Sequence, residues 1–159
     1  PDGKIYAWRS GPSPEFMLKR GVSASFSPTE EKNYPVQGTG GEWAKAAMWL
    51  AVRAFYKVRN FGGLALLVNQ VHDALYTDSA ETKTTEASAL LHACMEEAST
   101  FMEYWFDWDI PVRVPSDTTI GDTMMDEIGA SGTVYDRAKE YTQILRQDYM
   151  NGYTPDSNN

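Results

Sequence analysis

The stretch from Leu64 to Asp78 constrains the fold of this chain more than any other. The sequence Leu-Ala-Leu-Leu-Val-Asn-Gln-Val leads to the polar pair His72-Asp73, and a second run, Ala-Leu-Tyr-Thr-Asp, follows this pair. Strand-forming runs on both sides of a two-residue polar tip predict a tight β-hairpin. Hairpins of this length favour Asn-Gly or Asp-Gly at the tip, because the turn needs positive φ angles. His72-Asp73 is a poor turn pair, so it indicates a chemical site on a rigid ribbon.

Two long amphipathic helices are expected on either side of this hairpin. Pro35 and the glycine-rich residues 38–41 lead into the first, which should run to about Arg59. The second should run from about Thr82 to Phe106. Their apolar residues recur at spacings of three and four, as the helical repeat requires. These positions are Trp43, Ala47, Leu50, Ala51, Ala54, Phe55 and Val58 in the first helix, and Ala87, Leu91, Met95, Ala98, Met102 and Trp105 in the second.

Shorter elements complete an α+β fold. Lys4–Trp8 and Val22–Phe26 are expected to pair as a hairpin, and Ile110–Pro115 as a short strand whose prolines favour a sheet edge. Residues 116–132 are expected to be a polar loop, Tyr135–Tyr149 an amphipathic helix, and 151–159 disordered. The order is hairpin, helix, hairpin, helix, strand and helical tail. It predicts a mostly antiparallel sheet with long helices on one face.

The charge of the chain is unevenly distributed. The net charge is −8, yet residues 1–60 carry nine Lys/Arg against five Asp/Glu, and residues 61–159 carry five against seventeen. We therefore expect weak nucleic-acid binding by the chain alone, with a more basic partner supplying electrostatic attraction. No apolar run is long enough to cross a membrane, and no segment resembles a signal peptide. With the single cysteine Cys94, these features favour a cytoplasmic protein.

Two motifs together resemble the family A DNA polymerases. Asn33-Tyr34-Pro35-Val36-Gln37-Gly38-Thr39 precedes a long helix, and Val71-His72-Asp73 follows it. The family is the bacterial DNA polymerase I class, and its phage branch is most similar. The resemblance implies that residues 1–127 are the C-terminal part of a polymerase palm and that 128–159 are a helical tail ending in disordered residues. It also implies template-directed transfer of nucleotides from dNTPs to a primer 3′ end.

The resemblance implies a role for each matching residue. Asp73 corresponds to a carboxylate that helps hold two catalytic Mg²⁺ ions, and His72 to a histidine that lies against the primer 3′ end. Asn33 and Gln37 correspond to residues that contact the primer-template near the minor groove. Mg²⁺ prefers carboxylate oxygens, and side-chain amides can donate to the acceptors of every correct base pair. Lys45, on the same helix as Gln37, is a further candidate for contact with DNA phosphates.

The chain also departs from the family pattern. Ala74 stands where many members have Glu, and Thr29 stands where bacterial relatives have an arginine that contacts DNA. This sequence lacks the family's other metal-binding aspartate. It also lacks the basic helix that binds the phosphates of the incoming nucleotide. The chain alone is therefore expected to be inactive. The missing parts, including fingers and thumb, would come from upstream sequence or from a partner subunit.

Other interpretations remain open at this stage. The chain is alternatively a non-catalytic accessory or relic module that binds a polymerase partner and DNA. A stand-alone metal-dependent phosphohydrolase would need more ligands than His72, Asp73 and the other histidine, His92. Without a function, Asp73 would simply cap a turn, His92 would lie on the surface and Cys94 would pack in the core. We also expect Trp43, Trp49, Trp105 and Trp108 to be packing residues, and Asp122, Asp126 and Glu127 to be solvated.

Overall fold

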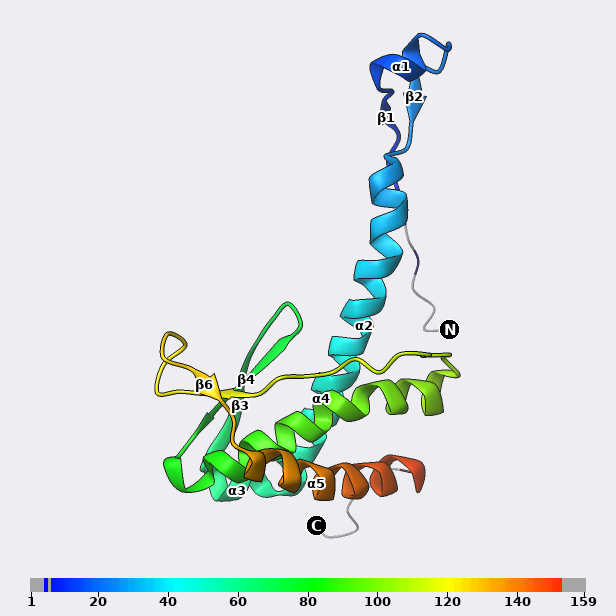
Figure 1. Ribbon diagram of the computed structural model, residues 1–159. Helices are drawn as coiled ribbons and strands as arrows, with labels where there is room; N and C mark the ends of the chain where they lie inside the picture. The colour runs from blue at the N-terminus through cyan, green and yellow to red at the C-terminus, as the bar shows by residue number, and fades with distance from the viewer. Residues whose placement is uncertain (1–4, 6, 153–159) are drawn as a thin grey trace. The chain divides into compact units, whose positions relative to one another are not determined.

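The computed structural model describes residue 5 and residues 7–152. Its contacts divide the chain into two compact units, Pro1–Glu42 and Trp43–Asn159, which are described separately below. The fold is α+β, as the sequence predicts, with antiparallel strand pairs and long helices (Figure 1). Within the described residues, the strands form three separate two-stranded ribbons.

The first unit holds a minimal hairpin and the start of a long helix. Its elements are β1 (Gly11–Pro12), α1 (Glu15–Leu18), β2 (Ala24–Ser25) and the first part of α2 (Pro28–Lys57). The predicted pairing of Lys4–Trp8 with Val22–Phe26 is wrong. Strand β2 lies within the second of these segments but pairs with β1, and neither Ala7 nor Trp8 is in a strand. Lys4 and Tyr6 lie outside the described residues.

Helix α2 begins much earlier than the prediction of a start after Gly41. The Ser27 hydroxyl accepts a hydrogen bond from the Glu30 amide at 3.4 Å, and the Ser27 carbonyl accepts one from Glu31 at 3.0 Å. Serine at the cap and proline at the first helical position are helix-start signals. Pro35 lies inside the helix, and its carbonyl accepts a hydrogen bond from the Thr39 hydroxyl at 2.8 Å. The start signals at Ser27 therefore outweigh the helix-breaking residues that follow.

The expected end of this helix near Arg59 is confirmed. Helix α2 ends at Lys57, and the short element α3 (Arg59–Gly63) follows with a positive φ at every residue. A left-handed backbone costs about 1–2 kcal/mol at each non-glycine residue. Phe61 packs edge-on against Phe55, with ring centroids 5.7 Å apart, and this contact helps to hold the reversal. The turn directs the chain into the central hairpin.

After the central hairpin, the second unit continues with helical elements. A 3₁₀ turn η1 (Glu81–Lys83) precedes α4 (Thr84–Phe106), and α5 (Gly132–Met150) closes the unit. Both helices match their predicted ranges within a few residues. Figure 1 shows α4 and α5 side by side and running in the same direction. Of the predicted disordered segment, residues 153–159 lie outside the described residues.

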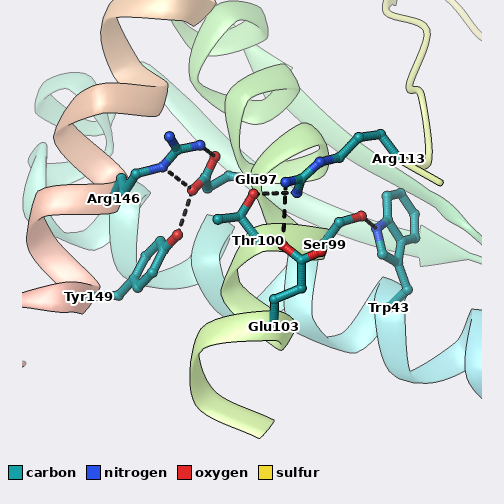
Figure 2. Close-up of polar contacts among 8 residues, drawn as sticks. All are labelled: Trp43, Glu97, Ser99, Thr100, Glu103, Arg113, Arg146 and Tyr149. Atoms are coloured by element: carbon teal, nitrogen blue, oxygen red, sulfur yellow. Dashed lines mark hydrogen bonds and ion pairs between the residues drawn. The ribbon is translucent and has the colours of Figure 1, made fainter. Parts of the chain in front are cut away.

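The core of the second unit lies where the second part of α2 meets α4 and α5. Alanines of α2 and α4 are buried in this core together with a few large side chains. Trp43 donates its indole N–H to the buried Ser99 hydroxyl at 3.2 Å, which ties α2 to α4 (Figure 2). The largest fully buried side chains are those of Tyr149, Phe55, Leu50, Glu97, Val134, Cys94 and Ser99.

The predicted strand at Ile110–Pro115 is wrong, because this segment has no strand partner. It belongs to an extended strap, residues 107–118, whose two prolines lack the amide hydrogens a strand ladder needs. Arg113 donates to the Thr100 hydroxyl of α4 at 2.5 Å and lies 3.3 Å from Glu103 (Figure 2). Side chains thus hold the strap along α4.

The residues expected to be a polar loop, 116–132, contain a small hairpin. Strands β5 (Thr119–Ile120) and β6 (Ile128–Gly129) pair in antiparallel orientation. Two-residue strands leave little apolar pattern in a sequence, so the periodicity that revealed the central hairpin is missing here.

Candidate functional site

The predicted central hairpin is confirmed. Strand β3 (Ala65–Val71) pairs with β4 (Ala74–Ser79), and the pair Val71 and Ala74 closes the ladder. His72 and Asp73 form the two-residue turn, and His72 takes a φ of 55°. Histidine is one of the few non-glycine residues enriched in this region of backbone space. The tip that the sequence singled out is therefore a tight turn at the end of a regular ladder.

Strand β3 carries one extra residue. The register passes from Leu67 opposite Thr77 to Asn69 opposite Tyr76, so Val68 forms a bulge. Beyond the bulge, Gln70 lies opposite Leu75, a partly buried residue packed against the core. The Gln70 side chain donates a hydrogen bond to the His72 carbonyl at 3.2 Å. Sequence reasoning missed Gln70, although it lies only two residues before the turn residue His72.

The carboxylate of Asp73 and the imidazole of His72 are both exposed. Within residues 5 and 7–152, no three side chains of His, Cys, Asp or Glu are grouped so that they could hold a metal ion. Mg²⁺ often uses only one or two protein carboxylates and takes its other ligands from water and phosphate. Asp73 fits the role of one such ligand. The described residues do not by themselves provide a site for two ions.

The other predicted site residues lie on α2. Asn33 and Gln37 are four residues apart, exposed, and belong to the first unit. Residues four apart lie on the same face of a helix, so one surface presents both amides. Lys45 is exposed on α2 in the second unit, as are His72 and Asp73 on their hairpin. The structure thus pairs Asn33 with Gln37 and His72 with Asp73.

The two residues that depart from the family pattern both lie in regular elements, Ala74 in β4 and Thr29 in α2. Ala74 is half-buried and lies opposite Val71, where it completes the ladder next to the turn. Thr29 is exposed in the first turn of α2.

His92 is not the surface residue that we expected. It is half-buried, and its Nδ1 lies 3.0 Å from the Thr118 hydroxyl and 3.3 Å from the Ser116 hydroxyl. Ser116 also donates through its amide to Glu96 at 2.6 Å. Burial lowers the pKa of His92, and the nearby carboxylates of Glu96 and Asp117 oppose this shift only in part. This histidine fastens the strap to α4.

The burial of the remaining residues agrees with the predictions in some cases and differs in others. Cys94 is buried in the core as predicted, and Trp43 is a packing residue. Trp49 and Trp105 are 39% and 47% exposed, so their assignment to packing is only partly right. The acidic residues Asp122, Asp126 and Glu127 are exposed as expected, and the Thr123 hydroxyl and amide hold the pKa of Asp126 below its usual value.

Comparison with known proteins relates about half of this chain to a DNA polymerase. No protein-family model matches the chain, and no solved structure does. The thermostable DNA polymerase I of Thermus filiformis is 37% identical to it over 82 residues, or 52% of this chain. Half of this chain is similar to a DNA polymerase I. The matched segment is 8% of that polymerase, so the chain spans less than two thirds of this relative's length. The predicted relation to DNA polymerases is confirmed at this level.

Among the helices in the described part of the chain, none combines the length and the apolar character that a bilayer crossing requires.

Proposed function

We propose that this chain is the C-terminal palm part of a phage-type family A DNA polymerase. The observation that carries the proposal is the tight turn of β3–β4, which presents Asp73 and His72 together at the end of a regular ladder. The similarity to a DNA polymerase I supports the same class. The reaction is the transfer of nucleotides from dNTPs to the 3′ end of a primer on a DNA template.

Each candidate residue has a role that its placement allows. Asp73 is exposed and supplies one carboxylate ligand to Mg²⁺, which stabilises the charge that develops on the transferred phosphate. His72, beside it, donates to the primer terminus. Asn33 and Gln37 present two amides from one helix face, suited to the minor-groove acceptors of base pairs. Lys45 offers a positive charge to a DNA phosphate.

The remaining parts of the active site lie outside the described residues in this proposal. A second carboxylate, the fingers and the thumb come from another part of the polymerase, in the same polypeptide or in a partner subunit. That part also supplies positive charge, because residues 61–159 carry only five Lys/Arg against seventeen Asp/Glu. We place the complete enzyme in the cytoplasm, where primer-template DNA and dNTPs are found.

Two observations favour a second candidate function. The described residues hold no metal-binding group of three ligands, and the acidic second part of the chain repels DNA phosphates. An accessory or relic module, which binds a polymerase partner and DNA without contributing to chemistry, would have the same features.

Primer extension separates the two functions. The chain is produced together with the product of the coding sequence that precedes it, and extension is measured for the wild type, Asp73→Asn and Asp78→Asn. Asp78 is the matched control, because it is an exposed aspartate on the same hairpin. A loss of at least about 100-fold in Asp73→Asn alone supports the polymerase, since a lost charge-stabilising group has an effect of this size. Equal extension by all three proteins overturns it and favours the accessory module.

A further inference from the structure

The turn that carries Asp73 is tied to a side chain outside the turn. The Gln70 amide group donates to the His72 carbonyl at 3.2 Å, while the Gln70 backbone N–H donates to the Asn69 side chain at 2.8 Å. We propose that Gln70 is a positioning residue for Asp73, holding the turn in the one conformation that presents its carboxylate. This inference rests on the proposed function, because it assumes that the carboxylate binds a metal ion.

The bulge at Val68 decides on which face of the ribbon Gln70 lies, and the contact with His72 requires this face. Cross-strand partners share a face of the ribbon, so Gln70 shares the core-facing side of Leu75. Without the extra residue, the register of Leu67 opposite Thr77 would place Asn69 opposite Leu75. Gln70 would then oppose Ala74, and the loop would gain a third residue. One inserted residue thus yields both the two-residue turn and the position of Gln70.

The conformation of His72 gives the contact its importance. A φ of 55° places its backbone in the left-handed region, which is strained for a residue with a Cβ. The strained conformation persists only where neighbouring groups favour it. The His72 carbonyl belongs to the peptide that joins His72 to Asp73. A donor fixed on this oxygen therefore restrains the orientation of the peptide from which the Asp73 side chain projects.

The half-buried position of Gln70 separates its role from that of Asp73. Its side-chain amide donates to the His72 carbonyl, whereas the Asp73 carboxylate is exposed on the tip. Gln70 is thus placed to act on the metal ligand through the backbone and not as a ligand itself. Loss of its donor releases the turn into other conformations and lowers the fraction of molecules in which Asp73 is correctly presented.

The test uses NMR spectroscopy of the full chain, with Mn²⁺ as the probe because it shares the oxygen ligands of Mg²⁺. Gln70→Met removes the donor at similar size, and Gln70→Lys restores a donor of similar reach. Gln143→Met is the matched control, because Gln143 is an exposed glutamine on α5. The first readout is the intraresidue amide-to-Hα contact of His72, which is strong only at positive φ. The second is Mn²⁺-induced broadening of the Asp73 amide signal.

In Gln70→Met we expect the positive-φ signature to weaken and the apparent Mn²⁺ affinity at Asp73 to fall about threefold or more, as when two thirds of the molecules leave the competent conformation. Gln70→Lys should recover the positive-φ signature, the readout that does not depend on the charge of the new side chain, and Gln143→Met should change neither readout. An unchanged His72 signature in Gln70→Met overturns the inference. If Asp73→Asn leaves the broadening intact, the proposed metal role fails, and with it the positioning role, even where the His72 signature responds.

Discussion

Arg146 binds both carboxylate oxygens of Glu97, with Nε donating to Oε1 and Nη2 donating to Oε2 at 2.8 Å each. The Tyr149 hydroxyl donates to the same Oε1 at 2.5 Å, as Figure 2 shows. Glu97 is 2% exposed, so this charge is stable in the core only because α5 supplies its partners. The hydrogen bond to Glu97 raises the pKa of Arg146, and burial raises the pKa of Tyr149. Helix α5 is thereby joined to α4 as part of the fold.

Removing Arg146 should destabilise the chain strongly. Arg146→Met leaves a buried carboxylate with only Tyr149 as partner, and we expect the free energy of unfolding to fall by about 3 kcal/mol. Urea denaturation followed by circular dichroism measures it. The double variant Glu97→Leu/Arg146→Met should lose much less, because no unpaired charge remains. Lys139→Met, which breaks an exposed ion pair with Asp136, should have little effect. Similar losses in all three proteins would contradict this account.

Acid should loosen the strap through His92. Burial depresses the pKa of His92 in the folded state, so the unfolded chain binds a proton more readily. The contribution of neutral His92 to stability is present above its unfolded pKa near 6.5 and is lost as the pH falls toward the lower folded value. We expect His92→Gln to flatten the fall in unfolding midpoint between about pH 7.5 and 5.5. A fall in midpoint that is as steep in His92→Gln as in the wild type would contradict this account.

Alanine substitutions should reveal whether α2 is continuous. Gly40 lies inside the helix with open space around its Cα, so Gly40→Ala should raise helix content and stabilise the chain by up to about 1 kcal/mol. Gly63 has a φ of 84°, where a Cβ is strained, and Gly63→Ala should destabilise by about 1 kcal/mol. Far-ultraviolet circular dichroism with thermal melting measures both. An unchanged helix content in Gly40→Ala would contradict a helix that runs through residue 40.

The single cysteine should be unreactive in the folded chain. Cys94 is fully buried, and burial together with the charge of Glu97 raises the pKa of its thiol above the usual range. Because the thiolate is the reacting form, a chromogenic disulfide reagent should modify Cys94 only after unfolding. Rapid modification at neutral pH without denaturant would mean that α4 and α5 separate readily. The comparison with Arg146→Met is informative, since this variant should react faster.

Local patterns account for the parts of the fold that the sequence predicted well. The hairpin around His72-Asp73, helix α4 and helix α5 each carry a repeat of apolar residues within one continuous segment. The start of α2 differs from the prediction because Pro35 and the glycines are helix-breaking residues, yet the cap at Ser27 and the hydrogen bonds that follow it begin the helix before them. The predicted strand at Ile110–Pro115 is wrong because a strand needs a partner, and the residues of a single strand do not specify that partner.

By itself, the sequence determined the α+β class, the tip that presents His72 and Asp73, and the resemblance to DNA polymerases. Only the tertiary structure decided which distant side chains meet. It joined Glu97 to Arg146 and placed His92 against Thr118, and it showed the bulge that puts Gln70 beside the turn. The physical reason is that a periodic apolar pattern specifies which face of an element is buried. Hydrogen bonds between distant residues also depend on the register and packing of the elements that carry them.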